Sequence, residues 1–107
     1  MKVFISQPMK GKTNEEILAV RNSIISEMGK KYNNVEIVDS FFENAPVDAK
    51  PLWFLGKSLE LLSGADIAYF AKGWQDARGC RIECMCALEY GIKTEFEEAI
   101  CEDFPKE

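Results

Sequence analysis

The sequence predicts one α/β domain, a three-layer sandwich in which helices cover both faces of a parallel sheet of four to five strands. Three observations lead to this prediction. Short apolar runs rich in β-branched residues alternate with longer segments whose apolar residues recur at helical spacing. The run at 66–71 is apolar almost throughout, which is typical of a strand covered on both faces. The 107 residues are enough for one core, so 1–107 is expected to be a single Rossmann-like or flavodoxin-like domain.

The chain is expected to begin with a strand and a long helix. The strand covers Lys2–Ile5 and ends before Gln7 and Pro8. Thr13 followed by Glu16 is a capping box, which predicts a helix start. The apolar face of this helix comprises Ile17, Leu18, Ile24, Ile25 and Met28, and its polar face comprises Arg21, Asn22, Glu27 and Lys30.

A second strand, a long loop and a second helix are expected next. The strand covers Val35–Asp39 after a turn at Asn33 and Asn34. Residues 41–50 have no apolar period and form a loop long enough to reach over a site. Pro51 opens the second helix, which ends at Ser63-Gly64. Its core face is predicted from Leu52, Leu55, Leu59 and Leu62.

The last third of the chain predicts a strand, a loop, a helix and an edge strand. After the apolar strand at 66–71, a loop runs to Gly79 and a helix covers Cys80–Tyr90, with Gly91 as its cap. Residues 93–100 are expected to form the edge strand, followed by a short acidic tail.

Composition excludes several classes of partner. The net charge of −5 disfavours a nucleic-acid surface, and no apolar run is long enough to cross a membrane. The first residues are too short for a signal peptide, so a cytoplasmic protein is expected. Histidine is absent, so any catalysis must rely on carboxylates, Lys, Tyr or Cys.

The cysteines are expected to be reduced and structural. Cys80 and Cys84 share a helix face but supply only half of a metal site, while Cys86 and Cys101 complete the set. We therefore predict neither a metal nor a cofactor.

The segment from Gly73 to Glu83 is the strongest candidate for a site. It joins the end of an apolar strand to the start of a helix, where parallel α/β sheets bind ligands. Arg78 and Arg81 flank Gly79 near the helix start, which itself attracts anions. Glu83 is expected in the first turn, as a helix stabiliser or as a positioned nucleophile or base.

A phosphate loop is a weaker alternative. Ser6 to Thr13 nearly matches the pattern G-x-x-x-x-G-K-T between a strand and a helix. However, Ser6 replaces the first glycine, and Pro8 lacks an N–H group for phosphate. An NTPase is therefore the third of three functional hypotheses.

Lys2 to Met9, together with the Gly73–Glu83 segment, resembles the nucleoside 2-deoxyribosyltransferase-like superfamily, above all its small uncharacterised bacterial and phage domains. The resemblance extends to about Lys93. It implies a Rossmann-like subunit that acts on nucleosides or nucleoside monophosphates. It also implies that Glu83 attacks the anomeric carbon of the sugar, and that the subunits form dimers or larger assemblies.

The sequence departs from the deoxynucleotide hydrolases of that superfamily at three positions. Phe4 replaces a tyrosine, Ala77 replaces a phosphate-binding serine, and Ser58 stands near the place of an aspartate. Asp76 or Glu60 would then have to support Glu83 by protonating or holding the leaving base. The predicted catalytic residues are accordingly Glu83 and Asp76.

A nucleotide-binding module without turnover is the second hypothesis. In it, Arg78 and Arg81 hold a phosphate and Trp74 stacks on a base, although Trp74 is equally consistent with a lid on the sheet edge. The full set of predicted ligand contacts is Ser6, Gln7, Pro8, Met9, Gly73, Trp74, Arg78, Gly79 and Arg81. The loops at 6–12 and 73–79 are expected at the same edge of the sheet.

Self-association is also expected. Trp53, Phe54 and Leu55 are consecutive apolar residues, and one helix can bury only part of such a run in its own core.

Overall fold

The computed structural model describes residues 1–38 and 45–97 of the chain. In these ranges four strands form one parallel sheet in the order β2-β1-β3-β4. The strands are β1 (Lys2–Ser6), β2 (Glu36–Val38), β3 (Ile67–Phe70) and β4 (Lys93–Phe96). The helices are α1 (Asn14–Lys31), α2 (Pro51–Leu62) and α3 (Arg78–Glu89), and a short 3₁₀ helix, η1 (Trp74–Asp76), precedes α3. The predicted parallel α/β fold is confirmed, and its arrangement is flavodoxin-like.

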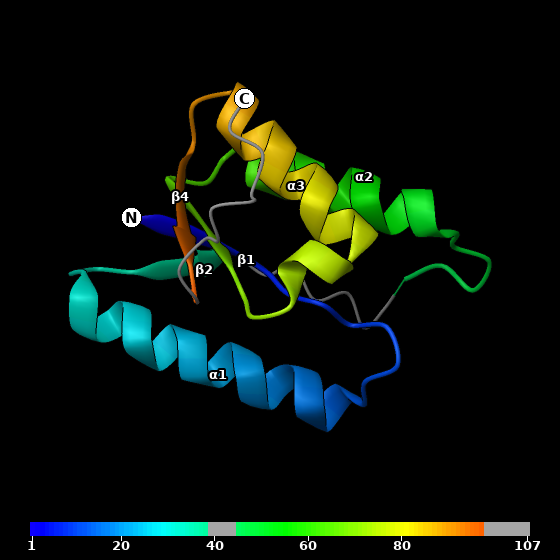
Figure 1. Cartoon of the computed structure of the whole chain (residues 1–107), viewed down its shortest axis with the longest axis horizontal. Helices are drawn as coiled ribbons and strands as arrows, with labels where there is room; N and C mark the ends of the chain where they lie inside the picture. The colour runs from blue at the N-terminus through cyan, green and yellow to red at the C-terminus, as the bar shows by residue number, and fades with distance from the viewer. Residues whose placement is uncertain (39–44, 98–107) are drawn as a thin grey trace.

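Helices cover both faces of the sheet, as Figure 1 shows. α1 lies on one face, and α2 and α3 lie together on the other. The side chains of β1 alternate between the two layers, because successive residues of a strand point to opposite faces. Val3 and Ile5 pack in the core cluster on the α1 side, whereas Phe4 packs with Cys84 and Ala87 of α3. The same alternation directs Ser6, the last residue of β1, toward α3.

The buried stripe of α1 differs from the predicted one. It comprises Ile17, Arg21, Ile24 and Met28. The placement of Arg21 on the solvent face was wrong, since Arg21 is only 5% exposed. Arg21 lies four residues after Ile17 and three before Ile24, so it shares their face of the helix. The prediction that Leu18 belongs to the core face was also wrong, because this side chain is exposed.

The core face of α2 also differs from the expected leucine pattern. Ser58 and Leu62 are buried and Leu59 packs partly against the core, but Leu52 is 77% exposed. At about 100° per residue, Leu52 is rotated by about 120° from Ser58 around the helix axis. The assignment of Leu52 to the core face was therefore wrong.

Several element boundaries differ from those expected: β1 extends to Ser6, and β3 is shorter than the apolar run at 66–71. α3 begins at Arg78, before the predicted Cys80, because the extended backbone of Ala77 already precedes the helix. β2 begins at Glu36, and β4 ends at Phe96. Residue 39 of the predicted second strand, residues 41–44 of the predicted loop and residues 98–100 of the predicted edge strand lie outside the described residues. Among residues 1–38 and 45–97, each helix is too short or too polar to span a membrane.

The turn after β3 depends on a glycine, which gives a first testable prediction. Gly73 has φ +87°, a conformation that L side chains rarely adopt, and a Cβ there would lie 3.5 Å from Pro8 Cγ. We expect Gly73→Ala to lower the free energy of unfolding by about 1–2 kcal/mol in urea denaturation.

Gly29 supplies the matched control, since it lies within α1 and an added Cβ would meet nothing within 4 Å. Gly29→Ala should raise stability by about 0.5–1 kcal/mol. Equal effects of the two substitutions would contradict the role assigned to the Gly73 turn.

Candidate active site

The two predicted site loops meet at the carboxyl edge of the sheet. β1 and β3 are parallel neighbours, and Ser6 pairs with Phe70 in their register. The N–H of Ala71 donates to the carbonyl of Ser6 at 2.8 Å, which ties the two strand ends together. The prediction that the loops at 6–12 and 73–79 share an edge is confirmed. α1 leaves β1 on one face and α3 follows β3 on the other, so this edge is a topological switch point, where such sheets bind ligands.

Glu83 is buried at this edge and points toward the end of β1. It is 8% exposed. The hydroxyl of Ser6 donates a hydrogen bond to Glu83 Oε1 at 2.6 Å. Ser58 of α2 is buried and lies within hydrogen-bonding reach of the carboxylate. Residues from β1, α2 and α3 therefore converge on one acidic group.

The expected position of Glu83 in the first helical turn was wrong. α3 begins at Arg78, so Glu83 lies in the second turn and its side chain is turned toward the sheet. The helix dipole acts mainly within the first turn. The environment of Glu83 is instead set by burial and by hydroxyl groups. Burial raises the pKa of Glu83 from its ordinary value, and the hydroxyl groups of Ser6 and Ser58 oppose that increase.

A thiol completes the surroundings of Glu83. Cys80 precedes it by one turn of α3, is 5% exposed and lies within hydrogen-bonding reach of the Ser6 hydroxyl. Burial raises the pKa of the Cys80 thiol to about 11, although Ser6 opposes the shift. Cys80 is therefore a neutral thiol at neutral pH, which does not favour it as a nucleophile.

Gln7 is held by α1. Its side-chain Nε2 donates to the carbonyl of Ile17 at 3.1 Å, and its Oε1 accepts from Arg21 Nη1 at 2.8 Å. Gln7 and Arg21 are both buried. These contacts assign Gln7 a clear structural role: it fastens the loop after β1 to the helix that follows. A contact between Gln7 and a ligand stays a prediction.

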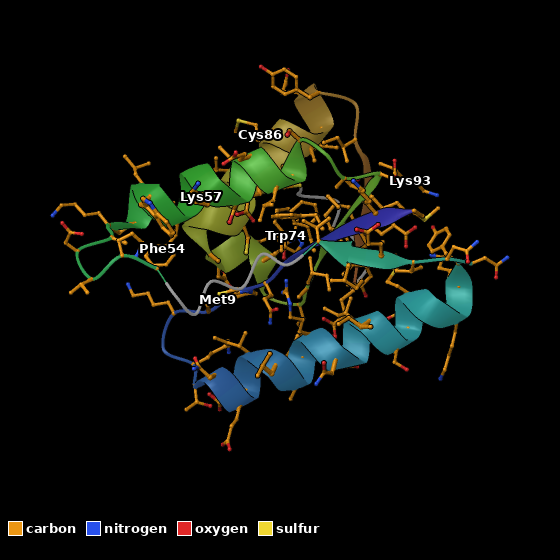
Figure 2. All side chains as sticks on the ribbon, turned by 180° about the vertical axis from the view of Figure 1, so that it is seen from behind. Met9, Phe54, Lys57, Trp74, Cys86 and Lys93 are labelled. Carbon is orange, nitrogen blue, oxygen red and sulfur yellow. The ribbon has the colours of Figure 1, made fainter. Side chains whose placement is uncertain are left out.

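Trp74 lies in the core on the α3 side, as Figure 2 shows. It is 5% exposed, and its ring centroid lies 5.5 Å from that of Phe70 and 5.3 Å from that of Phe96. These contacts support a packing role for Trp74 beneath the loop. Stacking on a base stays a prediction, and it would require the ring to leave these partners.

The charged residues of the second loop are at the surface. Asp76, Arg78 and Arg81 are exposed, and Arg81 Nη1 donates to the carbonyl of Gln75 at 2.8 Å. No hydrogen bond among the described residues joins Asp76 to Glu83. Asp76 is thus at the surface whereas Glu83 is buried, and a shared catalytic role stays a prediction. Ser58, which stands near the place of an acid in the resembled superfamily, lies near Glu83.

The loop after β1 shows the predicted helix cap. Thr13 and Glu16 form the reciprocal capping box, with side-chain bonds of 3.1 and 2.8 Å. The N–H of Lys12 donates to the carbonyl of Met9 at 3.1 Å, so one amide of the phosphate-loop hypothesis is already engaged. Pro8 and Met9 are half-buried in this loop, as is Gly79 at the start of α3.

A pocket of about 330 Å³ lies at the same edge, on the α1 side. It is lined by Gln7, Pro8, Lys12, Val20, Lys72 and Glu97. Its lining combines two basic side chains with the acidic Glu97, and Pro8 and Val20 supply apolar surface.

The described cysteines, Cys80, Cys84 and Cys86, are unpaired with one another, while Cys101 lies outside the described residues. Across 1–38 and 45–97, no three His, Cys, Asp or Glu side chains form a group suited to a metal ion. Comparison with known proteins gives no match to a family model, to a curated protein or to a solved structure. The fold and the geometry around Glu83 therefore carry the functional argument.

Proposed function

We propose that this domain cleaves or transfers the N-glycosidic bond of a nucleoside or nucleoside monophosphate, with Glu83 as the nucleophile. The observation that carries the proposal is a buried carboxylate that accepts a hydrogen bond from Ser6 at the carboxyl edge of a parallel sheet, with Ser58 nearby. An ionisable group that is desolvated by its surroundings and aimed at a ligand-binding edge is typical of a functional site. The resemblance to the nucleoside 2-deoxyribosyltransferase-like superfamily supports the same residue.

The proposed reaction has two steps, as in retaining glycosidases. A carboxylate oxygen of Glu83 attacks the anomeric carbon, the bond from that carbon to the base nitrogen breaks, and the base leaves with the electron pair. The base takes up a proton from water, and the sugar remains bound to Glu83 through an ester bond. Water, or a second base, then attacks the anomeric carbon, the ester bond breaks and the Glu83 carboxylate is restored.

Nucleotide binding without turnover is the second candidate. Arg78 and Arg81 stand exposed in the first turns of α3, where the helix terminus also favours an anion. A phosphate group bound there would lie on the same helix as Glu83. The departures at Phe4, Ala77 and Ser58 favour this candidate, because the resembled hydrolases use those positions for catalysis or phosphate binding.

A screen for base release separates the two candidates. Purified protein is incubated with ribonucleosides, deoxynucleosides, their monophosphates and NAD, and free base is measured by chromatography. Ligand-induced shifts in melting temperature are recorded in parallel. Base release supports the enzyme, whereas thermal shifts without base release support the binding module and contradict the proposal.

We further propose that the chain forms homodimers or larger homo-oligomers through the outer side of α2. Leu52 is 77% and Phe54 37% exposed, and Trp53 packs edge-to-face on Phe54 with ring centroids 5.1 Å apart. Apolar surface of this kind marks contacts between proteins. Sedimentation should give a species larger than the 12.1 kDa chain at micromolar concentration, and Leu52→Glu should shift it toward the monomer. A wild-type protein that sediments at 12.1 kDa would contradict this proposal.

A further inference from the structure

Two buried hydroxyl groups, one from β1 and one from α2, lie near the Glu83 carboxylate. Ser6 is the last residue of β1 and is 2% exposed, while Ser58 lies in the middle of α2 and is 9% exposed. Their surroundings are apolar, because the core cluster on this face contains Phe4, Phe70 and other hydrophobic side chains. A hydroxyl in such a place is costly unless it is hydrogen-bonded. Ser6 directs its hydroxyl to the Glu83 carboxylate, and the hydroxyl of Ser58 lies within hydrogen-bonding reach of the same group.

The bond from Ser6 has the geometry of a charge-assisted hydrogen bond. Its length of 2.6 Å falls within the range of about 2.5–2.7 Å typical of a hydroxyl that donates to a carboxylate. A serine hydroxyl has a single proton, so Ser6 commits that proton to Glu83 Oε1.

The backbone keeps Ser6 in this position. Its carbonyl accepts from the N–H of Ala71 at 2.8 Å, and the residue is paired with Phe70 in the parallel register. Ser58 is equally constrained, since it lies on the buried side of α2. The two hydroxyl groups therefore have fixed origins on separate elements, and the bond from Ser6 restricts the direction of the carboxylate.

We propose that Ser6 and Ser58 are positioning residues, which fix the direction of the Glu83 carboxylate and maintain it as an ionised nucleophile in apolar surroundings. This inference rests on the proposed function of Glu83. It gives Ser6 a role different from the ligand contact that its place in the loop predicts. It also gives Ser58 a role in the site, although Ser58 lacks the acidic group that the resembled hydrolases have near this position. A nucleophile has to be both ionised and aimed, and hydroxyl donors supply both conditions.

The test follows the titration of Glu83 itself. The side-chain carboxyl of Glu83 is titrated by ¹³C NMR in the wild type, Ser6→Ala and Ser58→Ala. Removal of either donor should move the midpoint to higher pH, because the ionised form loses a hydrogen bond. Ser58→Ala is the variant expected to fold, because alanine is favoured within a helix, so the titration can be measured on it. Ser58→Thr retains a hydroxyl and should restore the midpoint toward that of the wild type.

Ser63→Ala is the matched control. Ser63 follows α2, is exposed and donates to the carbonyl of Glu60, so its removal should leave the Glu83 midpoint unchanged. In the base-release assay, the acidic limb of the kcat/KM profile should move to higher pH in both site variants. Their kcat/KM at neutral pH should fall by about tenfold to a hundredfold.

The NMR titration tests this inference, and the base-release assay tests the proposed function. An unchanged Glu83 midpoint in both alanine variants would overturn the positioning role, even if the wild type releases base. Midpoints that move as expected in a protein that releases no base would support the positioning role and contradict the proposed function.

Discussion

Glu83→Gln is expected to reduce base release by at least about a thousandfold, since replacement of a catalytic nucleophile removes the covalent step. The amide has nearly the same shape as the carboxylate and still accepts from Ser6, so the site should remain folded. Ligand binding, followed by the shift in melting temperature, should change little. The measurement is the rate of base release by chromatography with the best substrate of the screen.

Glu89→Gln is the matched control for this substitution. Glu89 is exposed at the end of the same helix, so its amide variant should keep the full rate. Full turnover by the Glu83→Gln protein would contradict the covalent mechanism. Nucleotide binding without turnover would then be favoured, and Arg78 and Arg81 would be the next residues to replace.

Trp74→Ala is expected to lower the free energy of unfolding by about 3–5 kcal/mol, as is usual when a large core aromatic is truncated. The ring is 5% exposed and packs against Phe70 and Phe96. Its loss would leave a cavity between the sheet and the start of α3, directly beneath the loop from Gly73 to Gly79. Urea denaturation monitored by circular dichroism measures the effect.

Trp74→Phe retains most of the packing and should cost clearly less than the alanine variant. This pair distinguishes packing from base stacking. A Trp74→Ala protein with nearly unchanged stability but lost nucleotide binding would contradict the packing role and would support a contact with the base.

Local patterns predicted the fold well, because the signals for each element are carried by neighbouring residues. The apolar run at 66–71 became the buried strand β3, and the Thr13–Glu16 capping box begins α1 as expected. The same local reading failed for Arg21. Its charge led to the prediction that it lies on the polar face, although its spacing places it on the face of Ile17 and Ile24. Gln7 of the preceding loop accepts a hydrogen bond from the buried Arg21, a contact that the helix pattern does not reveal.

The site was predicted only in part, because its key contacts join residues far apart in the chain. The loops were correctly placed at one edge, since parallel strands that neighbour each other end together. The bond between Ser6 and Glu83 spans 77 positions, and no spacing rule reveals it. In the sequence, Ser58 was notable only because the resembled hydrolases have an aspartate near this position. Its contact with Glu83 arises from the packing of α2 beside α3.

The most direct test of the account compares the stability of wild type and Glu83→Gln as a function of pH. Burial raises the pKa of Glu83 in the folded state. The wild type is therefore most stable, relative to the variant, when Glu83 is protonated, and it loses that stability as the pH rises through the raised pKa. Titrations of all other groups are shared by the two proteins and cancel in the difference.

We predict that Glu83→Gln is more stable than the wild type at neutral pH, and that the difference shrinks toward about pH 4, near the ordinary carboxyl pKa. Such a result would show that the fold maintains a destabilising carboxylate, as expected for a group retained for function. A wild type that is more stable than the variant at neutral pH, with the difference vanishing in acid, would show that ionised Glu83 stabilises the fold, and would contradict the account.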